Sequence, residues 1–225
     1  MTGTSLSLLF NNLALLIVVT PFKTYRVIFL LLVLFAISAC GLLGTRHPEM
    51  HGRILHEVHD KPLAHTEVVA LWKGTEQQDK TEKRICYHVE SATADDKGFV
   101  SIPEWREPNT YKSLKNKTIE VYAFRKYYRT SELTNQVLTD KNFNYYLAKP
   151  RHIENKNKAR EARLRYLQLL LGKTTCDLKG ESRKNLQPLF IAIIKEASGL
   201  AVTKKDKAVV KKLKGWLQFI SVEEK

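Results

Sequence analysis

The chain has 225 residues, of which 44% are hydrophobic and 27% are charged, and its formal net charge is +14. This length is sufficient for one domain with a good core, or for a domain and a smaller appendage. The positive charge is uneven: Gly41–Ala148 has 16 Lys and Arg against 15 Asp and Glu, whereas Lys149–Lys225 has 19 against 8. Cys86 and Cys176 lie 90 residues apart, a spacing that excludes a zinc motif.

The N-terminal segment has the order of elements of a bacterial lipoprotein signal. Lys23 and Arg26 precede the apolar run Val27–Phe35, and residues 37–40 read Ile-Ser-Ala-Cys. An aliphatic residue, two small residues and a cysteine after such a run form a lipobox, whose small residues give the peptidase access to the backbone. We therefore expect residues 1–39 to be a signal peptide. Cys40 then becomes a diacylated N-terminus, with membrane lipid as its partner.

Two alternatives remain for this segment. Residues 27–39 could be a simple membrane anchor with an incidental Cys40, although about 13 apolar residues fall short of the roughly 20 that span a bilayer. A second apolar stretch, Leu6–Val19, precedes the basic residues, where a lipoprotein signal normally begins. We hypothesise that residues 1–18 lie upstream of the true start. A two-helix membrane hairpin is the competing interpretation.

The residue after the lipobox indicates the compartment. Gly41 stands where an Asp would signal retention at the inner membrane, so we expect an outer-membrane lipoprotein on its periplasmic or surface face. In that environment Cys86 and Cys176 are expected to form a disulfide. Closing a loop of about 90 residues contributes on the order of 4 kcal/mol in the chain-entropy model.

The basic C-terminal third suggests an anionic partner. In an exported protein nucleic acid is not an expected target. Anionic lipid headgroups, lipopolysaccharide phosphates or an acidic envelope protein are the candidates. The alternative is that these lysines form solvated helix faces.

The region 52–148, which follows a tether at 40–51, is predicted to be a seven-stranded antiparallel β-sandwich. Its clearest turn is residues 95–98, where Gly98 supplies the positive φ of a tight hairpin. Gly74–Arg84 and Glu104–Lys117 are expected to be long polar loops. The predicted strands are Gly52–Val58, Thr66–Trp72, Ile85–Thr93, Phe99–Ile102, Thr118–Phe124, Gln136–Leu138 and Phe143–Leu147.

The region 149–225 is predicted to be a basic appendage of about three short helices packed on the sandwich. Gly172 is the expected end of the first helix and Asn185 the expected N-cap of the second. Thr203 with Asp206 opens the third. The predicted faces of the first helix are Ala159, Ala162, Tyr166 and Leu169, with Leu164, Leu167 and Leu171 beside them.

Several motifs resemble a known family. Residues 52–68, with Asp60-Lys61-Pro62-Leu63 at their centre, resemble the opening of carboxypeptidase-regulatory-like domains, and residues 93–103 resemble the hairpin that follows in that family. Residues 86–90, 102–105 and 184–189 resemble uncharacterised bacterial lipoproteins that carry this domain. The resemblance implies a transthyretin-type β-sandwich serving as an accessory or binding module.

Catalytic chemistry is not indicated. Transthyretin-like folds include 5-hydroxyisourate hydrolases, which share a terminal Tyr-Arg-Gly-Ser; the nearest string here, residues 128–131, is internal and lacks the glycine. A Gly-x-Ser-x-Gly elbow and a phosphate-cradling glycine loop are also missing from the sequence. His51, His56, His59 and His65 are close in sequence, but on a strand and turn they need not converge on a metal. We expect no enzyme activity, catalytic residue, metal or cofactor.

Aromatic residues crowd the later strands, where most should pack in the core. An exposed subset could bind a ligand, and Trp105, Tyr127 and Tyr128 are the candidates. Trp105 is expected to be a lid over the end of the sandwich or a ligand contact. The expected function is a non-catalytic envelope lipoprotein. The alternatives are a carbohydrate- or peptide-binding accessory module and a cryptic hydrolase or metal protein.

Overall fold

The structure is a computed structural model that describes residues 44–78, 81–175 and 181–221. The predictions for the signal segment and Cys40, and for Cys176, lie outside these described residues. The chain divides into two compact units, Met1–Thr45 and Arg46–Lys225. The second unit therefore contains both the β-rich region and the C-terminal helices. Within the described residues, no helix is long and apolar enough to cross a membrane.

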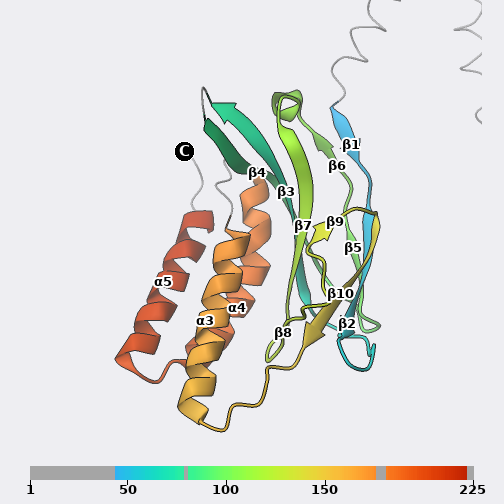
Figure 1. The fold of residues 1–225 in the computed structure, drawn as a ribbon. Coiled ribbons are helices and arrows are strands. Elements are labelled where there is room, and N and C mark those ends of the chain that lie inside the picture. Colours follow the sequence, from blue (N-terminus) through green and yellow to red (C-terminus); the bar gives the residue numbers. More distant parts are fainter. Residues whose placement is uncertain (1–43, 79–80, 176–180, 222–225) are drawn as a thin grey trace, which may run out of the picture. The chain divides into compact units, whose positions relative to one another are not determined.

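The second unit is mainly β with three C-terminal α-helices, as the sequence predicts (Figure 1). The described residues form ten strands in three sheets rather than seven strands in a sandwich. The strands are β1 (Thr45–His47), β2 (Met50–His56), β3 (Glu67–Gln78), β4 (Thr81–Thr93), β5 (Phe99–Ile102), β6 (Trp105–Glu107), β7 (Lys115–Phe124), β8 (Arg129–Thr130), β9 (Val137–Leu138) and β10 (Asn142–Ala148).

Two four-stranded sheets pack on each other. One has the order β5-β2-β10-β8 and the other β4-β3-β7-β9, while β1 and β6 form a separate ladder. Ile54, Trp72, Val121 and Tyr145 belong to the core shared by the two sheets. The expected antiparallel arrangement has one exception, because β10 runs parallel to β2. Parallel neighbours cannot be joined by a tight turn, so local turn signals do not reveal such a pair.

Both segments expected to be long polar loops contain strands. Residues 74–78 and 81–84 lie in the long paired strands β3 and β4, in which Gly74 pairs with Ile85 and Thr75 with Arg84. Backbone hydrogen bonds between strands form whatever the side chains are, so polar composition alone gave the wrong prediction. Glu104–Lys117 contains β6, a 3-10 turn at Asn109–Tyr111 and the start of β7. The expected tether at 40–51 likewise contains β1 and the start of β2.

The helices cover the outer face of the β4-β3-β7-β9 sheet. They are α3 (Lys156–Thr174), α4 (Gln187–Leu200) and α5 (Lys204–Ser221), with a 3-10 helix, η2 (Glu181–Leu186), before α4. One hydrophobic cluster joins Val69 and Leu71 of β3 to Leu167 of α3 and Phe190 of α4. This sheet is therefore buried on both faces, and all five residues of Val68–Trp72 are at most 1% exposed.

The helix ends agree only in part with expectation. Thr203 and Asp206 form the predicted reciprocal cap, because the backbone N–H of each donates to the side chain of the other, at 2.9 and 3.2 Å. Asn185 does not cap α4; its Nδ2 donates to Val89 O on β4 at 2.9 Å. Gly172 lies within α3 rather than at its end. The Asn185 side chain, predicted to cap α4, therefore binds a carbonyl on the edge strand β4 instead.

The buried face of α3 also differs from the first predicted face. Leu164, Leu167, Leu170 and Leu171 are buried, whereas Leu169 is 59% exposed. The leucine face of α3 packs on the sheet because it buries more apolar area than the face containing two alanines would. β2 ends at His56, two residues before the predicted end of the strand, and Val58 is exposed in the following turn.

Candidate functional site

The segment from the end of β7 to the first residue of β8, Arg125–Arg129, is a tight, cationic turn, which we call the basic–aromatic loop. Tyr128 N donates to Arg125 O at 3.0 Å and closes the turn. Tyr127 has a φ of 65° and an exposed fraction of 59%. The Lys126 ammonium lies 4.7 Å from the centre of the Tyr127 ring. A left-handed conformation costs a non-glycine residue about 1–3 kcal/mol, so other contacts must hold this loop in place.

A buried ion pair between two helices holds the basic–aromatic loop. Arg163 of α3 donates to Glu196 of α4 through Nε and Nη2, both at 2.8 Å. Their side chains are only 9% and 2% exposed. Arg163 also donates to the Tyr128 carbonyl, and Tyr127 N donates to Glu196 Oε1 at 3.4 Å. The helix layer thus fixes the loop that presents Tyr127, a dependence with no local signal in the sequence.

The start of β8 has a second anchor on α3. Thr130 N donates to the Tyr166 hydroxyl at 2.9 Å, and the hydroxyls of Thr130 and Tyr145 lie 3.1 Å apart. Burial raises the pKa of Tyr145 to about 12, so the phenol stays neutral and can donate a hydrogen bond. The loop is therefore anchored at Tyr127 and Tyr128 by the ion pair and, just past its C-terminal end, at Thr130 by Tyr166.

Two cavities adjoin the basic–aromatic loop. The loop–α4 cavity has a volume of about 310 Å³ and is lined by Arg125 and Lys126 of the loop, Lys195 and Glu196 of α4, and His65, Glu67, Phe124 and Ala192. The loop–α3 cavity, of about 360 Å³, is lined by Arg129, Arg151 and Tyr166 together with Glu132, Pro150, Ile153, Ala159, Ala162 and Arg163. The Arg163–Glu196 ion pair contributes one residue to each.

Tyr128 and Trp105 occupy different surroundings from Tyr127. The Tyr128 ring is half-buried and meets the His56 ring edge-on, with centroids 5.9 Å apart. Trp105 is 9% exposed and stacks between His88, at 3.6 Å, and His47, at 4.7 Å. Both faces of the indole are therefore covered by protein.

The Trp105 stack and the basic–aromatic loop lie at different points along β7. Trp105 packs edge-on against Trp72, which pairs with Ile119 in the middle of β7, whereas the loop follows Phe124 at its end. The structure thus brings Tyr127 and Tyr128 into one loop and leaves Trp105 elsewhere. Trp105 Nε1 and Trp72 Nε1 are buried without a hydrogen-bond acceptor in the described part of the chain.

Glu107 lies beside the Trp105 stack and is 1% exposed. Burial by itself would raise its pKa, but hydrogen bonds from Lys117 and from His47 Nε2, the latter at 2.9 Å, outweigh burial and lower it. Tyr87 has a raised pKa because it is buried and faces the Glu107 carboxylate. The buried charge of Glu107 is thus compensated by Lys117 and His47, an arrangement that favours a structural role for this cluster.

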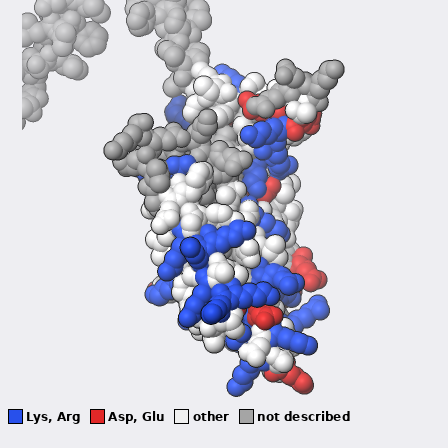
Figure 2. All heavy atoms as spheres, turned by 90° about the vertical axis from the view of Figure 1, so that its left-hand side faces the viewer, with Lys and Arg blue, Asp and Glu red and all other residues white. Residues whose placement is uncertain are grey.

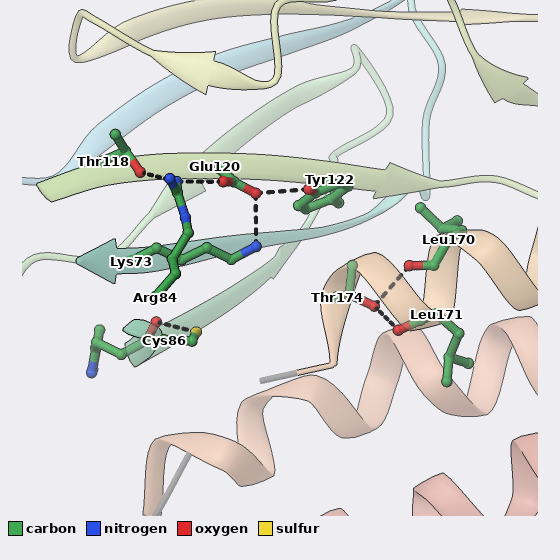
Figure 3. A network of polar contacts seen from close by, with 10 residues as sticks. Lys73, Arg84, Cys86, Thr118, Glu120, Tyr122, Leu170, Leu171 and Thr174 are labelled. Carbon is green, nitrogen blue, oxygen red and sulfur yellow. Dashed lines mark hydrogen bonds and ion pairs between the residues drawn. The ribbon is translucent and has the colours of Figure 1, made fainter. Parts of the chain in front are cut away.

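A second carboxylate, Glu120 of β7, is similarly saturated. It accepts hydrogen bonds from Lys73 Nζ at 2.8 Å, Tyr122 Oη at 2.7 Å and Arg84 Nη2 at 2.9 Å (Figure 3). Burial opposes ionisation of Glu120, yet these donors lower its pKa. With three donors on one carboxylate, Glu120 is arranged to stay ionised and to join three strands rather than to accept a proton.

Cys86 of β4 lies near the Glu120 network and faces the helix layer (Figure 3). It is 8% exposed and belongs to the same hydrophobic cluster as Leu170 and Leu171 in the last turns of α3. Cys176 follows α3 in the sequence and lies outside the described residues. The disulfide between Cys86 and Cys176 stays a prediction.

The four clustered histidines are dispersed in the fold. The His56 and His59 rings stack with centroids 5.4 Å apart, whereas His65 pairs with Asp96 at 3.1 Å and His51 lies beside Ser101 on β5. In the portion of the chain that the structure describes, no three His, Cys, Asp or Glu side chains gather as metal ligands would.

The exposed surface of the helix layer is strongly basic. Eleven Lys and Arg residues of α3, α4 and α5 are exposed: Lys156, Lys158, Arg165, Lys173, Lys195, Lys204, Lys205, Lys207, Lys211, Lys212 and Lys214. Two of the three carboxylates on α3, α4 and α5 are buried and paired, Glu196 with Arg163 and Asp206 with Arg160, which leaves only Glu161 exposed. Figure 2 shows Lys and Arg side chains gathered on this face.

Comparison with known proteins gives no family assignment. Neither a family model nor a curated protein matches the chain. One solved structure that resembles part of it is a 9R-lipoxygenase from Cyanothece PCC8801, at 13% sequence identity and a TM-score of 0.27. The match covers 80% of this chain and 28% of the lipoxygenase chain. At this TM-score the likeness says nothing about fold or activity.

Proposed function

We propose that this protein is a non-catalytic, lipid-anchored module of the bacterial envelope whose basic helix layer contacts anionic lipid headgroups or lipopolysaccharide phosphates. The observation that carries the proposal is the distribution of charge on the helices. Their exposed side chains comprise eleven cations and one carboxylate, because the other two carboxylates are paired internally. The lipobox at Cys40 supports a membrane location, and the packed β-sheets are compatible with the transthyretin-type sandwich that the motif resemblance implies.

The spacing on α5 favours contact with a flat surface. Lys204, Lys207, Lys211 and Lys214 recur at three or four residues, so they lie along one stripe of the helix. Near an anionic membrane each such cation contributes about 1 kcal/mol, and the attraction falls off within about 10 Å at 0.1 M salt. A lipid anchor and a polybasic face together hold a protein on a membrane better than either does alone.

Lipidation is tested by incorporation of radiolabelled palmitate in the native host. We expect label on the wild-type chain and none on Cys40→Ala, with both variants compared after membrane fractionation. Absence of label on the wild type would reject the lipid anchor. It would favour the two-helix membrane hairpin instead.

The basic face is tested by amine acetylation of the protein in native membranes and after extraction into neutral detergent. Lys204, Lys207 and Lys211 should be protected in membranes and released by high salt, while exposed Lys61 and Lys97 on the β-sheet unit serve as internal controls. Equal reactivity of helix and control lysines would refute the contact. The purified protein is then placed in vesicles of zwitterionic lipid with and without anionic lipid. Protection that is seen in native membranes but not in anionic vesicles would contradict lipid binding and indicate an acidic protein partner.

The predicted disulfide belongs to the same proposal, since it would attach the helix layer to the sheet covalently. A peptide linking Cys86 and Cys176 should be found by mass spectrometry of the unreduced protein. If both cysteines are alkylated without reduction, the disulfide is rejected.

A carbohydrate- or peptide-binding role is the second candidate, and the exposed ring of Tyr127 favours it. Tyrosine gives a large contact area at low entropic cost, and this ring stands on a rigidly anchored turn. Binding on a glycan or peptide array should be lost in Tyr127→Ala and kept in Tyr111→Ala, a change in a half-buried tyrosine outside the loop. Binding that is unaffected by Tyr127→Ala would exclude the loop as the contact.

A further inference from the structure

We infer that the loop–α4 cavity binds a phosphate group carried on a small polyol. This goes beyond a general attraction between a basic face and an anionic surface, because it assigns one cavity and one chemical group. The site does not depend on lipidation of Cys40. Its residues come from β3, the end of β7, the basic–aromatic loop and α4.

The side chains that line the cavity carry more unpaired positive than negative charge. Arg125, Lys126 and Lys195 contribute three cations, and none of them forms an ion pair with a carboxylate in the described part of the chain. Of the two carboxylates in the lining, Glu196 is neutralised by Arg163 through two hydrogen bonds of 2.8 Å. An anion that enters the cavity therefore meets three cations, the His65 ring, which pairs with Asp96 at 3.1 Å, and the carboxylate of Glu67, which forms no ion pair within the described residues.

Arg125 is the least exposed of the three cations, since its side chain is half-buried. Its Nη1 atom is buried and has no hydrogen-bond partner within the described residues. The face of the Tyr128 ring lies 5.9 Å from the Arg125 Cζ. Because Arg125 lines the cavity and a guanidinium carries five N–H donors, it can donate hydrogen bonds to an anion there.

The geometry favours phosphate over a carboxylate. A carboxylate is satisfied by one guanidinium, whereas here cations project from two elements, the loop and α4, as suits a group with three terminal oxygens. Glu67 accepts a hydrogen bond from Thr93 Oγ1 at 3.1 Å and has acceptor capacity left for hydroxyl groups. A volume of about 310 Å³ accommodates a phosphate with a glycerol- or sugar-sized substituent. The ligand class is therefore a phosphorylated polyol, either free or as a lipid headgroup.

The test is calorimetric titration of the full-length protein in neutral detergent with glycerol 3-phosphate. We expect saturable binding that is weakened about tenfold or more in Arg125→Gln/Lys195→Gln, as the loss of charge-assisted hydrogen bonds implies. Lys207→Gln/Lys211→Gln on α5 removes the same charge away from the cavity and should change affinity less than twofold. Equal weakening in the two double variants, or no saturable binding by the wild type, would overturn the site.

Two further measurements keep the inference falsifiable. Lys195 is exposed, so Lys195→Gln alone should leave folding intact and still weaken binding several-fold; unchanged binding would count against the site. Short-chain phosphatidic acid in the same detergent separates the two sources of the phosphate. Equal affinity for both probes supports a free phosphorylated polyol, and tighter binding of phosphatidic acid supports a lipid headgroup. Because these probes are titrated in solution, failure here leaves the membrane-contact experiment unaffected.

Discussion

Replacing Glu196 by glutamine tests whether the helix layer dictates the conformation of the basic–aromatic loop. The Arg163–Glu196 pair is buried, with side chains 9% and 2% exposed. Removing one partner from a buried ion pair typically costs 3–5 kcal/mol, because the remaining charge is left uncompensated. Glu196→Gln keeps the shape of the side chain and one acceptor oxygen, and Arg163 retains the Tyr128 carbonyl. We therefore expect the free energy of unfolding to fall by about 3 kcal/mol, the lower end of this range.

The assay is equilibrium unfolding in urea of the full-length chain in neutral detergent. At a slope of about 2–3 kcal/mol per molar, the midpoint should fall by about 1 M or more. Glu161→Gln is the matched control, since Glu161 is exposed on α3, and it should change stability by less than about 0.5 kcal/mol. Adding Arg163→Met completes a double-mutant cycle, in which we expect a coupling energy of about 2 kcal/mol.

The same variants report on the loop itself. Under native conditions trypsin should cut after Arg125 and Lys126 faster in Glu196→Gln than in wild type or Glu161→Gln, because the loop loses its anchor. A stability loss below about 1 kcal/mol, with additive effects of Glu196→Gln and Arg163→Met, would refute the reasoning. Unchanged cleavage would show that the turn holds its shape without the helices.

Three further predictions concern stability, each read from urea unfolding. Leu167→Ala should cost about 2–5 kcal/mol because Leu167 is 0% exposed, whereas Leu169→Ala, at a position 59% exposed, should cost little. Glu107→Gln should destabilise the protein at pH 7. Because the pKa of Glu107 is lowered in the folded state, its ionised form stabilises the fold above about pH 4.3, and this stabilisation is lost as the pH falls through the folded-state pKa. The free energies of unfolding of wild type and variant should therefore become equal in acid. Gly98→Ala should cost at least about 1 kcal/mol, since φ is 73° and a Cβ would lie 2.8 Å from Ile54 O. Gly199→Ala on α4, where a Cβ would enter open space, should be neutral or stabilising. A larger loss of stability in Gly199→Ala than in Gly98→Ala would contradict the argument from backbone conformation.

The candidate site could be found only in part from the sequence. Tyr127 and Tyr128 were candidates because aromatic residues crowd this part of the sequence and an exposed subset of them could bind a ligand. Trp105 gave the same kind of signal, yet it lies between two histidines that come from β1 and β4. Nothing local distinguishes an aromatic residue that a distant strand will cover from one that stays exposed.

The sequence by itself determined the features that depend on a few neighbouring residues. The turn at Asp95–Gly98 forms as expected, with Gly98 N donating to Asp95 O at 3.0 Å, and Thr203 with Asp206 opens α5. The division into a β-rich region and three C-terminal helices likewise follows from a change in hydrophobic period. Turn chemistry, capping and periodicity act within one or two turns of chain, so they survive whatever the rest of the molecule does.

Only the tertiary structure decided which surfaces are covered and which side chains meet. The run Val68–Trp72 is buried on both faces because helices more than 80 residues later cover the sheet. The Arg163–Glu196 pair joins α3 to α4 and also holds the backbone of the basic–aromatic loop, which precedes both helices in the sequence. These contacts are selected by the free energy of burying apolar area and pairing buried charge across the whole unit. No window of the sequence contains both partners of such a contact, so the fold alone places Arg125 and Lys195 around one cavity.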